Sequence, residues 1–129
     1  MSSSYTHKNV GDVTDVAPQF GFAETQESPF GREEVDAERT GFAHHYFKPG
    51  CRQPFGHRHE QAEEVYFVLS GSGRVKLDDE IVELKPRDVV RVAPSVMRGF
   101  EAGEDGLEVL AFGTYHAGDG EVVQGWWSD

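Results

Sequence analysis

The stretch that decides the fold of this chain is Glu64-Val65-Tyr66-Phe67-Val68-Leu69-Ser70-Gly71-Ser72-Gly73, which follows closely on His57-Arg58-His59. The apolar run from Val65 to Leu69 is rich in β-branched and aromatic side chains, and a Ser/Gly run closes it. That composition is typical of a half-buried strand that ends at a turn. We therefore expect a strand at about residues 64–70, joined by the Ser/Gly run to a second strand at about 73–77.

The same pattern of short β-rich runs continues on both sides of this stretch, from Thr40 to the end of the chain. Turn residues interrupt the runs roughly every 8–12 residues, which is typical of a sandwich or barrel. No long segment has the 3.6-residue period of an amphipathic helix, so parallel βαβ units are excluded. Leu77-Asp78-Asp79-Glu80-Ile81 has the form of a tight hairpin. The further strands are expected at about 41–48, 80–84, 88–93, 96–101, 106–115 and 121–125.

The sequence thus predicts an all-β protein, a closed antiparallel barrel or jelly roll of about eight strands, because closure hides the sheet edges. The 129 residues correspond to one domain, and 37% hydrophobic residues with 27% charged ones are an ordinary globular balance. We expect residues 1–39 to form an N-terminal arm and packing segment, which carries Phe20, Phe22 and Phe30 among glycine and proline. Residues 40–129 are expected to form the barrel.

Charge and cysteine content narrow the possible partners. The 23 acidic residues outnumber the 12 Lys and Arg residues, giving a formal net charge of −11. No basic stripe is available to neutralise nucleic-acid phosphates, and the charge repels anionic lipid surfaces. We therefore expect neither nucleic acid nor membrane as a partner. The first residues lack the hydrophobic core of a signal peptide, and the lone Cys51 cannot form an intrachain disulfide, so a cytoplasmic protein is expected.

His57, His59 and Glu64 form the strongest candidate site. Residues two apart in an extended chain point to the same face, so both imidazoles should project into one interior. Glu64 then opens the next strand. Two imidazoles and one carboxylate suit Fe, Mn, Ni, Co or Zn and leave coordination positions open. The alternative interpretation is a pair of surface histidines in a charged loop.

These motifs resemble those of the cupin superfamily. Gly50…His57-Arg58-His59-x4-Glu64-x6-Gly71 is similar to the first cupin motif, and Pro86-Arg87-Asp88-Val89-Val90 with Ala93-Pro94 continues the likeness. The resemblance covers about residues 40–115. It implies a double-stranded β-helix whose metal, where present, is held by the first-motif histidines and glutamate together with a second-motif histidine. It also implies a homodimer, with the 20–30 segment and Trp126-Trp127 as candidate contacts.

The second motif departs from the family pattern. Within Pro94-Ser95-Val96-Met97-Arg98-Gly99-Phe100-Glu101-Ala102, Arg98 stands at the position of the fourth metal ligand and Ala102 at that of an asparagine. Arg87 likewise replaces the glycine of the usual Pro-Gly-Asp. A guanidinium keeps its charge and has no free lone pair, so Arg98 cannot bind a metal. Three possibilities follow: Arg98 points outward, it pairs with Glu64 in a metal-free barrel, or it clamps a carboxylate or phosphate.

Several further residues are weaker candidates. Only one of His44 and His45 can point inward, because neighbouring strand residues alternate. Gln53 could offer a carbonyl oxygen to a metal, although a loop role is the plainer interpretation. Tyr66 belongs to the core with Phe100 and Phe112, and its hydroxyl could donate a proton beside His57. His116 is expected to be exposed to solvent, and Cys51 is expected to be a small buried or rim residue.

Three functions are compatible with the sequence. The first is a divalent-metal cupin that uses His57, His59 and Glu64 for oxygen activation, isomerisation or decarboxylation, with Arg98 holding a small anionic substrate. The second is a metal-free isomerase or epimerase, similar to the sugar-nucleotide epimerases of the superfamily, with either histidine as base and Tyr66 as acid. The third is a non-catalytic ligand-binding barrel. Whether the chain is an enzyme is left open at this point.

Overall fold

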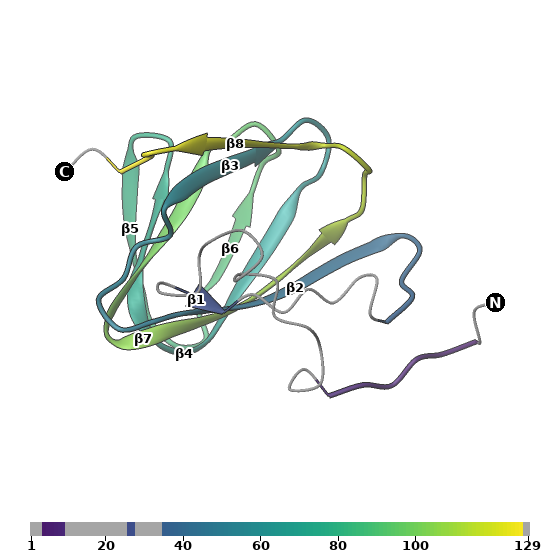
Figure 1. Ribbon diagram of the computed structural model, residues 1–129, viewed down its shortest axis with the longest axis horizontal. Coiled ribbons are helices and arrows are strands. Elements are labelled where there is room, and N and C mark those ends of the chain that lie inside the picture. The colour runs from purple at the N-terminus through teal and green to yellow at the C-terminus, as the bar shows by residue number, and fades with distance from the viewer. Residues whose placement is uncertain (1–3, 10–25, 28–34, 128–129) are drawn as a thin grey trace.

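The computed structural model describes residues 4–9, 26–27 and 35–127, and this part of the chain contains strands and no helix (Figure 1). The eight strands are β1 (Gln26–Glu27), β2 (Thr40–Phe47), β3 (Phe55–His59), β4 (Glu64–Leu77), β5 (Glu80–Leu84), β6 (Val89–Val92), β7 (Arg98–Thr114) and β8 (Gly120–Gln124). All pairings are antiparallel. The all-β expectation is confirmed. No helix in the described ranges is long and apolar enough to span a membrane.

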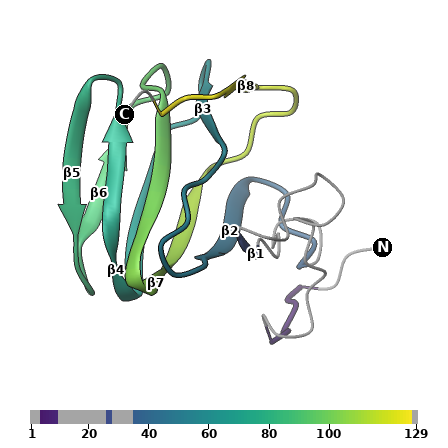
Figure 2. The same cartoon turned by 60° about the vertical axis from the view of Figure 1, so that its left-hand side comes forward.

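The two long strands β4 and β7 run side by side and belong to two sheets at once (Figure 2). The first half of β4 and the second half of β7 lie in sheet I, in the order β1-β2-β7-β4-β6. The other halves lie in sheet II, in the order β8-β3-β7-β4-β5. The two sheets enclose the core, and the buried apolar residues at its centre are Phe47, Tyr66, Val68, Val75, Phe100, Leu107 and Val109.

The predicted breaks inside β4 and β7 are wrong, because both are bends within continuous strands. Residues 70–73 were expected to join two separate strands, and the strands expected at 96–101 and 106–115 left a break between them. Instead the β4–β7 register shifts between Val68 and Ser70, and again between Gly71 and Gly73. Gly71 has φ +82°, and a Cβ there would lie 2.0 Å from the carbonyl oxygen of Gly106. Glycine therefore permits a bulge and a close backbone approach, and the strand bends from one sheet into the other.

Two other local predictions had different outcomes. The hairpin at 77–81 is confirmed, with Leu77 opposite Glu80 and φ +51° at Asp78. Strand β3 was not predicted as a strand, although its residues were expected to be extended. Its sequence Phe-Gly-His-Arg-His lacks β-branched residues, and pairing with β8 and with Arg98 supplies the order that local propensity does not.

Arg87 occupies a position where only glycine is free of strain. Its φ is +77°, and its N–H donates to the Val68 carbonyl at 2.8 Å. We expect Arg87→Gly to raise the free energy of unfolding by about 1 kcal/mol, because the left-handed conformation costs a residue with Cβ roughly that much. Urea unfolding measures the change. Arg87→Ala removes the same side chain but keeps Cβ, so it should give no gain; an equal gain in both variants would contradict the explanation.

The outer face of sheet I carries an apolar patch. Phe112, expected to pack inside, is 38% exposed there, because it alternates with the buried Ala111 along β7. Its outward-facing neighbours on β2, β4, β6 and β7 are Phe42, Val65, Phe67, Leu69, Val89 and Leu110. Such a face suits contact with another surface. The homodimer stays a prediction. Phe20, Phe22 and Phe30 lie outside the described residues, and the boundary at residue 39 also stays a prediction.

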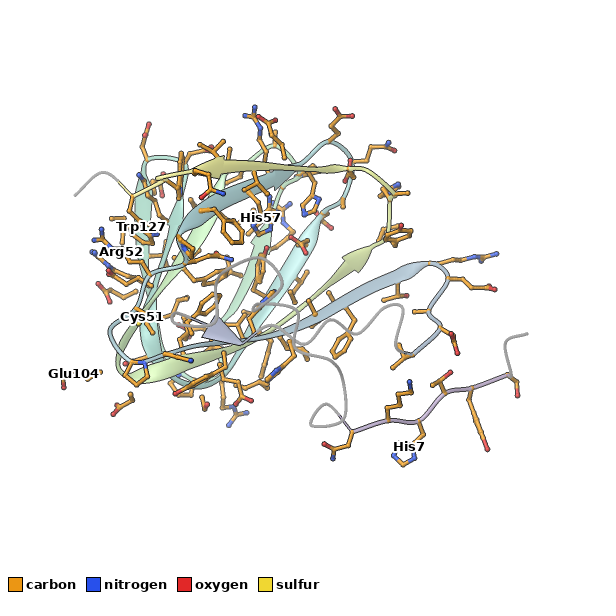
Figure 3. All side chains as sticks on the ribbon, in the orientation of Figure 1. His7, Cys51, Arg52, His57, Glu104 and Trp127 are labelled. Atoms are coloured by element: carbon orange, nitrogen blue, oxygen red, sulfur yellow. The ribbon has the colours of Figure 1, made fainter. Side chains whose placement is uncertain are left out.

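The C-terminal tryptophans, which the resemblance suggested as dimer contacts, lie against the outer face of sheet II of their own chain. Trp126 covers Gly56, where a Cβ would lie 2.6 Å from the indole ring. The guanidinium carbons of Arg52 and Arg74 lie 4.7 and 5.5 Å from the centre of the Trp127 ring, and Figure 3 shows Arg52 beside it. Cation–π contacts of this kind hold the end of the described chain on the sheet.

Candidate functional site

Both sheets contribute polar side chains to one group inside the barrel, near His57 in Figure 3. His57 and His59 come from β3, and Glu64 and Tyr66 come from the start of β4. Arg98 begins β7 and is the direct cross-strand neighbour of His57. Alternation along β3 explains why both histidines share the inner face, as the sequence predicted. Their side chains are 21% and 20% exposed, so neither is a surface histidine of a charged loop.

One oxygen atom, Oε1 of Glu64, is the centre of this group. The Tyr66 hydroxyl donates to it at 2.7 Å. Nε2 of His59 lies 3.1 Å away and Nε2 of His57 lies 3.4 Å away. Nη2 of Arg98 completes the set at 3.5 Å. The carboxylate therefore faces four groups that can donate hydrogen bonds or carry positive charge.

Arg98 points into the barrel and is fully buried. Its Nη1 donates to the carbonyl oxygens of Val96 at 2.8 Å, Pro94 at 3.3 Å and His57 at 3.5 Å. Of the three possibilities open from the sequence, the outward orientation is wrong and the pairing with Glu64 is observed. Nε and Nη2 of Arg98 have no hydrogen-bond partner, although buried polar groups normally have one. The guanidinium thus keeps unused donors next to the carboxylate.

The protonation states follow from burial and from these contacts. Burial raises the pKa of Glu64, but hydrogen bonds from His57, His59 and Tyr66 outweigh it, so the pKa falls well below 4.5. Burial lowers the pKa of His57, and the charge of Arg98 lowers it further. Burial and the adjacent Glu64 charge raise the pKa of Tyr66 well above 10. At neutral pH the group therefore holds a carboxylate, a neutral His57 and a protonated phenol.

His45 is a third imidazole of the same interior, and it is half-buried. It alternates with Ala43 and Phe47 on the inner side of β2, whereas His44 faces outward and contacts Glu108 at 2.8 Å. The expectation that only one of the pair points inward is confirmed. Burial lowers the pKa of His45 to about 4, and the charge of His57 adds to the effect. His45 is thus neutral at physiological pH.

A cavity of about 330 Å³ leads to the site from one end of the barrel. His59 and Glu64 lie on its wall, and most of the other wall residues are small: Gly41, Ala43, Ala62, Gly113, Thr114, Gly118 and Gly120. Phe42, Tyr115 and His116 also border it. His57, Tyr66 and Arg98 are not among its lining residues. A ligand in the cavity therefore meets His59 and Glu64 first, while the other three side chains lie behind them.

Asp119 is a site residue that the sequence reasoning missed. Its side chain is 4% exposed, and its carboxylate accepts the backbone N–H groups of Glu60, Gln61 and Ala62 at 3.0, 2.9 and 2.9 Å. Its Oδ2 also lies 3.5 Å from Nδ1 of His59. The only local signal is its place between two glycines, which indicates a turn and says nothing about which loop the side chain will reach.

The two remaining candidates from the sequence, Gln53 and Cys51, lie elsewhere in the fold. Gln53 is 3% exposed, and its side-chain oxygen accepts the N–H of Phe100 at 3.3 Å, so it braces β7. Cys51 is half-buried with a free thiol. Neither residue belongs to the group around Glu64.

The donor atoms of His57, His59 and Glu64 fit a metal ion. The ligand atoms all lie within 4.8 Å of one another, and among the described residues these three form the cluster with suitable donors. Both histidines present Nε2 to the carboxylate, and an imidazole–carboxylate set suits divalent first-row metals. These three residues could therefore hold a metal ion. The positive charge of Arg98 would repel such an ion, because the guanidinium lies beside the same carboxylate.

A bent two-sheet jelly roll with an interior His/His/Glu group defines a class of small β-barrel proteins. The family model described as the cupin domain matches residues 43–113, which is more than half of the chain. The chain belongs to this cupin family, and the resemblance inferred from its motifs is confirmed.

The individual proteins that resemble this chain share only a modest fraction of identical residues with it. An uncharacterized protein of Methanocaldococcus jannaschii is 31% identical over 71 residues, which are 53% of this chain and 57% of that protein. A cupin protein from Bacteroides fragilis has a TM-score of 0.71 at 23% identity, over 98% of this chain and 93% of its own. Oxalate decarboxylase from Bacillus subtilis has a TM-score of 0.75 at 18% identity, over 94% of this chain and 32% of its own. These likenesses to solved structures show the fold.

Proposed function

We propose that this chain is a metal-binding cupin in which His57, His59 and Glu64 hold a divalent ion, and that it binds or transforms a small anionic molecule in the barrel. One observation carries the proposal. Nε2 of both histidines and Oε1 of Glu64 converge on one point, and two of these three side chains line the cavity. Three protein ligands leave coordination positions open toward that cavity.

The protonation states favour metal binding at neutral pH. A metal ligand must be a neutral imidazole or a charged carboxylate, and the lowered pKa values of His57 and Glu64 provide both without a proton having to leave. When bound, a divalent ion would supply Lewis-acid polarisation and a template for the substrate. The chain's own contribution is to orient the imidazoles and to surround the site with small residues that admit only a small molecule.

Charge supports an anionic ligand. The charges of Glu64 and Arg98 cancel, so a divalent ion leaves the group with an excess of +2, or +1 when the nearby Asp119 is counted. The rest of the chain is strongly acidic, with a net charge of −11 overall. The loaded site is then a positive centre in a negative protein, which focuses small anions on the cavity. Among the similar structures, oxalate decarboxylase is named for such an anion.

A metal-free function is the second candidate, because Glu64 already has partners. The carboxylate contacts Arg98, Tyr66 and both histidines, which can satisfy its charge and its hydrogen-bonding capacity. In this case His59, which lines the cavity, would act as the base of an isomerase or epimerase, or the barrel would bind a ligand without catalysis. Tyr66 keeps its proton, since its pKa is raised, but it lies behind Glu64.

Metal titration of the untagged protein tests the proposal. After chelation, the wild-type chain should bind about one equivalent of Mn²⁺, Fe²⁺, Co²⁺, Ni²⁺ or Zn²⁺ in calorimetry, because one three-ligand site is available. We expect Glu64→Gln and His59→Ala to lose binding by about 100-fold or more, because each removes a ligand. His44→Ala is the matched control, since His44 faces outward to Glu108.

Oxalate serves as the anionic probe in the same experiment. It should bind more tightly to the metal-loaded chain than to the metal-free chain, because the ion makes the site positive. A wild-type chain that takes up none of these metals would contradict the metal-binding proposal, and oxalate binding that survives chelation would then favour the metal-free barrel. Equal oxalate binding with and without metal would contradict the role given to charge.

A further inference from the structure

Asp119 is a buried carboxylate that links two loops at the site. It lies just before β8, and it binds the loop of residues 60–62 that connects β3 to β4. That loop separates His59 from Glu64, so its conformation sets the distance between an imidazole and the carboxylate. Three consecutive backbone N–H groups point at one side chain, which leaves the loop little freedom.

The same carboxylate faces the ring nitrogen of His59 that the candidate metal site does not use. Oδ2 lies 3.5 Å from Nδ1, while Nε2 on the other side of the ring lies 3.1 Å from Glu64. A histidine that binds metal through one nitrogen commonly donates its other N–H to a carboxylate or carbonyl, which fixes the tautomer and the orientation of the ring. Nδ1 of both histidines is buried without a hydrogen bond, but among the described contacts only that of His59 has a carboxylate oxygen 3.5 Å away. The two histidines are thus not equivalent.

We propose that Asp119 is a positioning residue for His59: it receives the Nδ1–H proton in a hydrogen bond, so that the Nε2 lone pair is aimed at the ion held with His57 and Glu64. This inference rests on the proposed metal site. It adds that the site depends on a residue from the β7–β8 connection, 60 positions after His59 in the chain. At 3.5 Å the contact is long for a hydrogen bond, and it should shorten when the ring is drawn into coordination.

The test compares Asp119→Ala and Asp119→Asn with a matched control, Asp78→Ala. Asp78 also caps a loop, since its Oδ1 accepts the Met97 N–H at 2.9 Å, but no candidate ligand lies in contact with it. We expect the affinity for Zn²⁺ to fall by about 10- to 100-fold in Asp119→Ala, as for other partners of metal-binding histidines. Asp119→Asn keeps the side-chain shape and should fall less. Asp78→Ala should change the affinity by less than about threefold.

A spectroscopic readout separates positioning from loop stability. In the Zn²⁺-loaded wild type, proton NMR should show a slowly exchanging downfield signal from Nδ1–H of His59. That signal should disappear in Asp119→Ala and persist in Asp78→Ala. An unchanged Zn²⁺ affinity in Asp119→Ala would overturn the inference while leaving the metal site intact. An equal loss in Asp78→Ala, with the signal kept in both variants, would also overturn it, by showing general loosening. A wild-type chain that binds no Zn²⁺ in this assay would instead refute the proposed metal function, and the inference with it.

Discussion

Arg98→His is expected to raise the affinity of the site for a divalent metal by at least about tenfold. The substitution removes a permanent positive charge that lies 3.5 Å from the ligand oxygen of Glu64. For a divalent ion about 5 Å from a guanidinium, Coulomb's law with an effective dielectric constant of about 20 gives a repulsion of roughly 7 kcal/mol as an upper bound. Glu64 offsets part of it. A neutral imidazole at the same strand position also adds a fourth ligand.

Arg98→Met separates the two causes of the expected gain. Methionine removes the charge without adding an imidazole, so its gain in affinity measures relief of repulsion alone. The additional gain in Arg98→His then measures coordination. Calorimetry with Zn²⁺ and Mn²⁺ gives both values. If neither variant binds metal more tightly than the wild type, the repulsion attributed to Arg98 is wrong, and the pocket lacks metal competence for another reason.

Glu64→Gln is expected to lower the free energy of unfolding of the metal-free protein by about 3–5 kcal/mol, as when one partner of a buried ion pair is removed. Arg98 is fully buried, and Glu64 is the carboxylate that faces it. Glutamine keeps the shape and can still accept from Tyr66, but it leaves the guanidinium without a counter-charge. Glu63→Gln is the matched control: its pair with Arg91 is exposed, so the loss should be below about 1 kcal/mol.

The double variant Glu64→Gln/Arg98→Met should recover most of that loss, because both charges leave the interior together.

The contribution of Glu64 to the free energy of unfolding also depends on pH. Since the pKa of Glu64 is lower in the folded chain than the ordinary 4.5, its contribution is present above pH 4.5 and is lost as the pH falls below that value. Urea unfolding at pH 7 and at pH 3 measures both effects. A loss below 1 kcal/mol for Glu64→Gln at pH 7 would contradict the ion-pair interpretation.

The elements predicted correctly are those whose signals are local. The Asp78-Asp79 turn and the strand after it are encoded by neighbouring residues, so the 77–81 hairpin could be identified without the fold. The bends in β4 and β7 could not. A glycine-rich run marks a chain reversal and a bulge equally well, and only the approach of Gly71 to the Gly106 carbonyl distinguishes them.

In the candidate site, too, the features set by local sequence could be predicted, and those set by long-range contacts could not. His57 and His59 share a face because a strand alternates, and that holds before any partner strand is placed. Asp119 was not recognised as a neighbour of His59, because it lies 60 positions later in the chain, and the sequence left open which of His44 and His45 points inward. Their places depend on pairing between β2 and β7 and between β3 and β8.

The residue sequence by itself determined the cupin family, the alternation that turns two imidazoles inward, and the presence of a non-ligating cation where a fourth ligand would stand. The tertiary structure alone decided where that cation goes: the register of β3 against β7 puts Arg98 beside His57, and the bend of β4 brings Glu64 within 3.5 Å of it. The reason is physical. Side-chain direction is a property of each strand, whereas the distance between charges on different strands depends on register and curvature, which contacts across the whole barrel set.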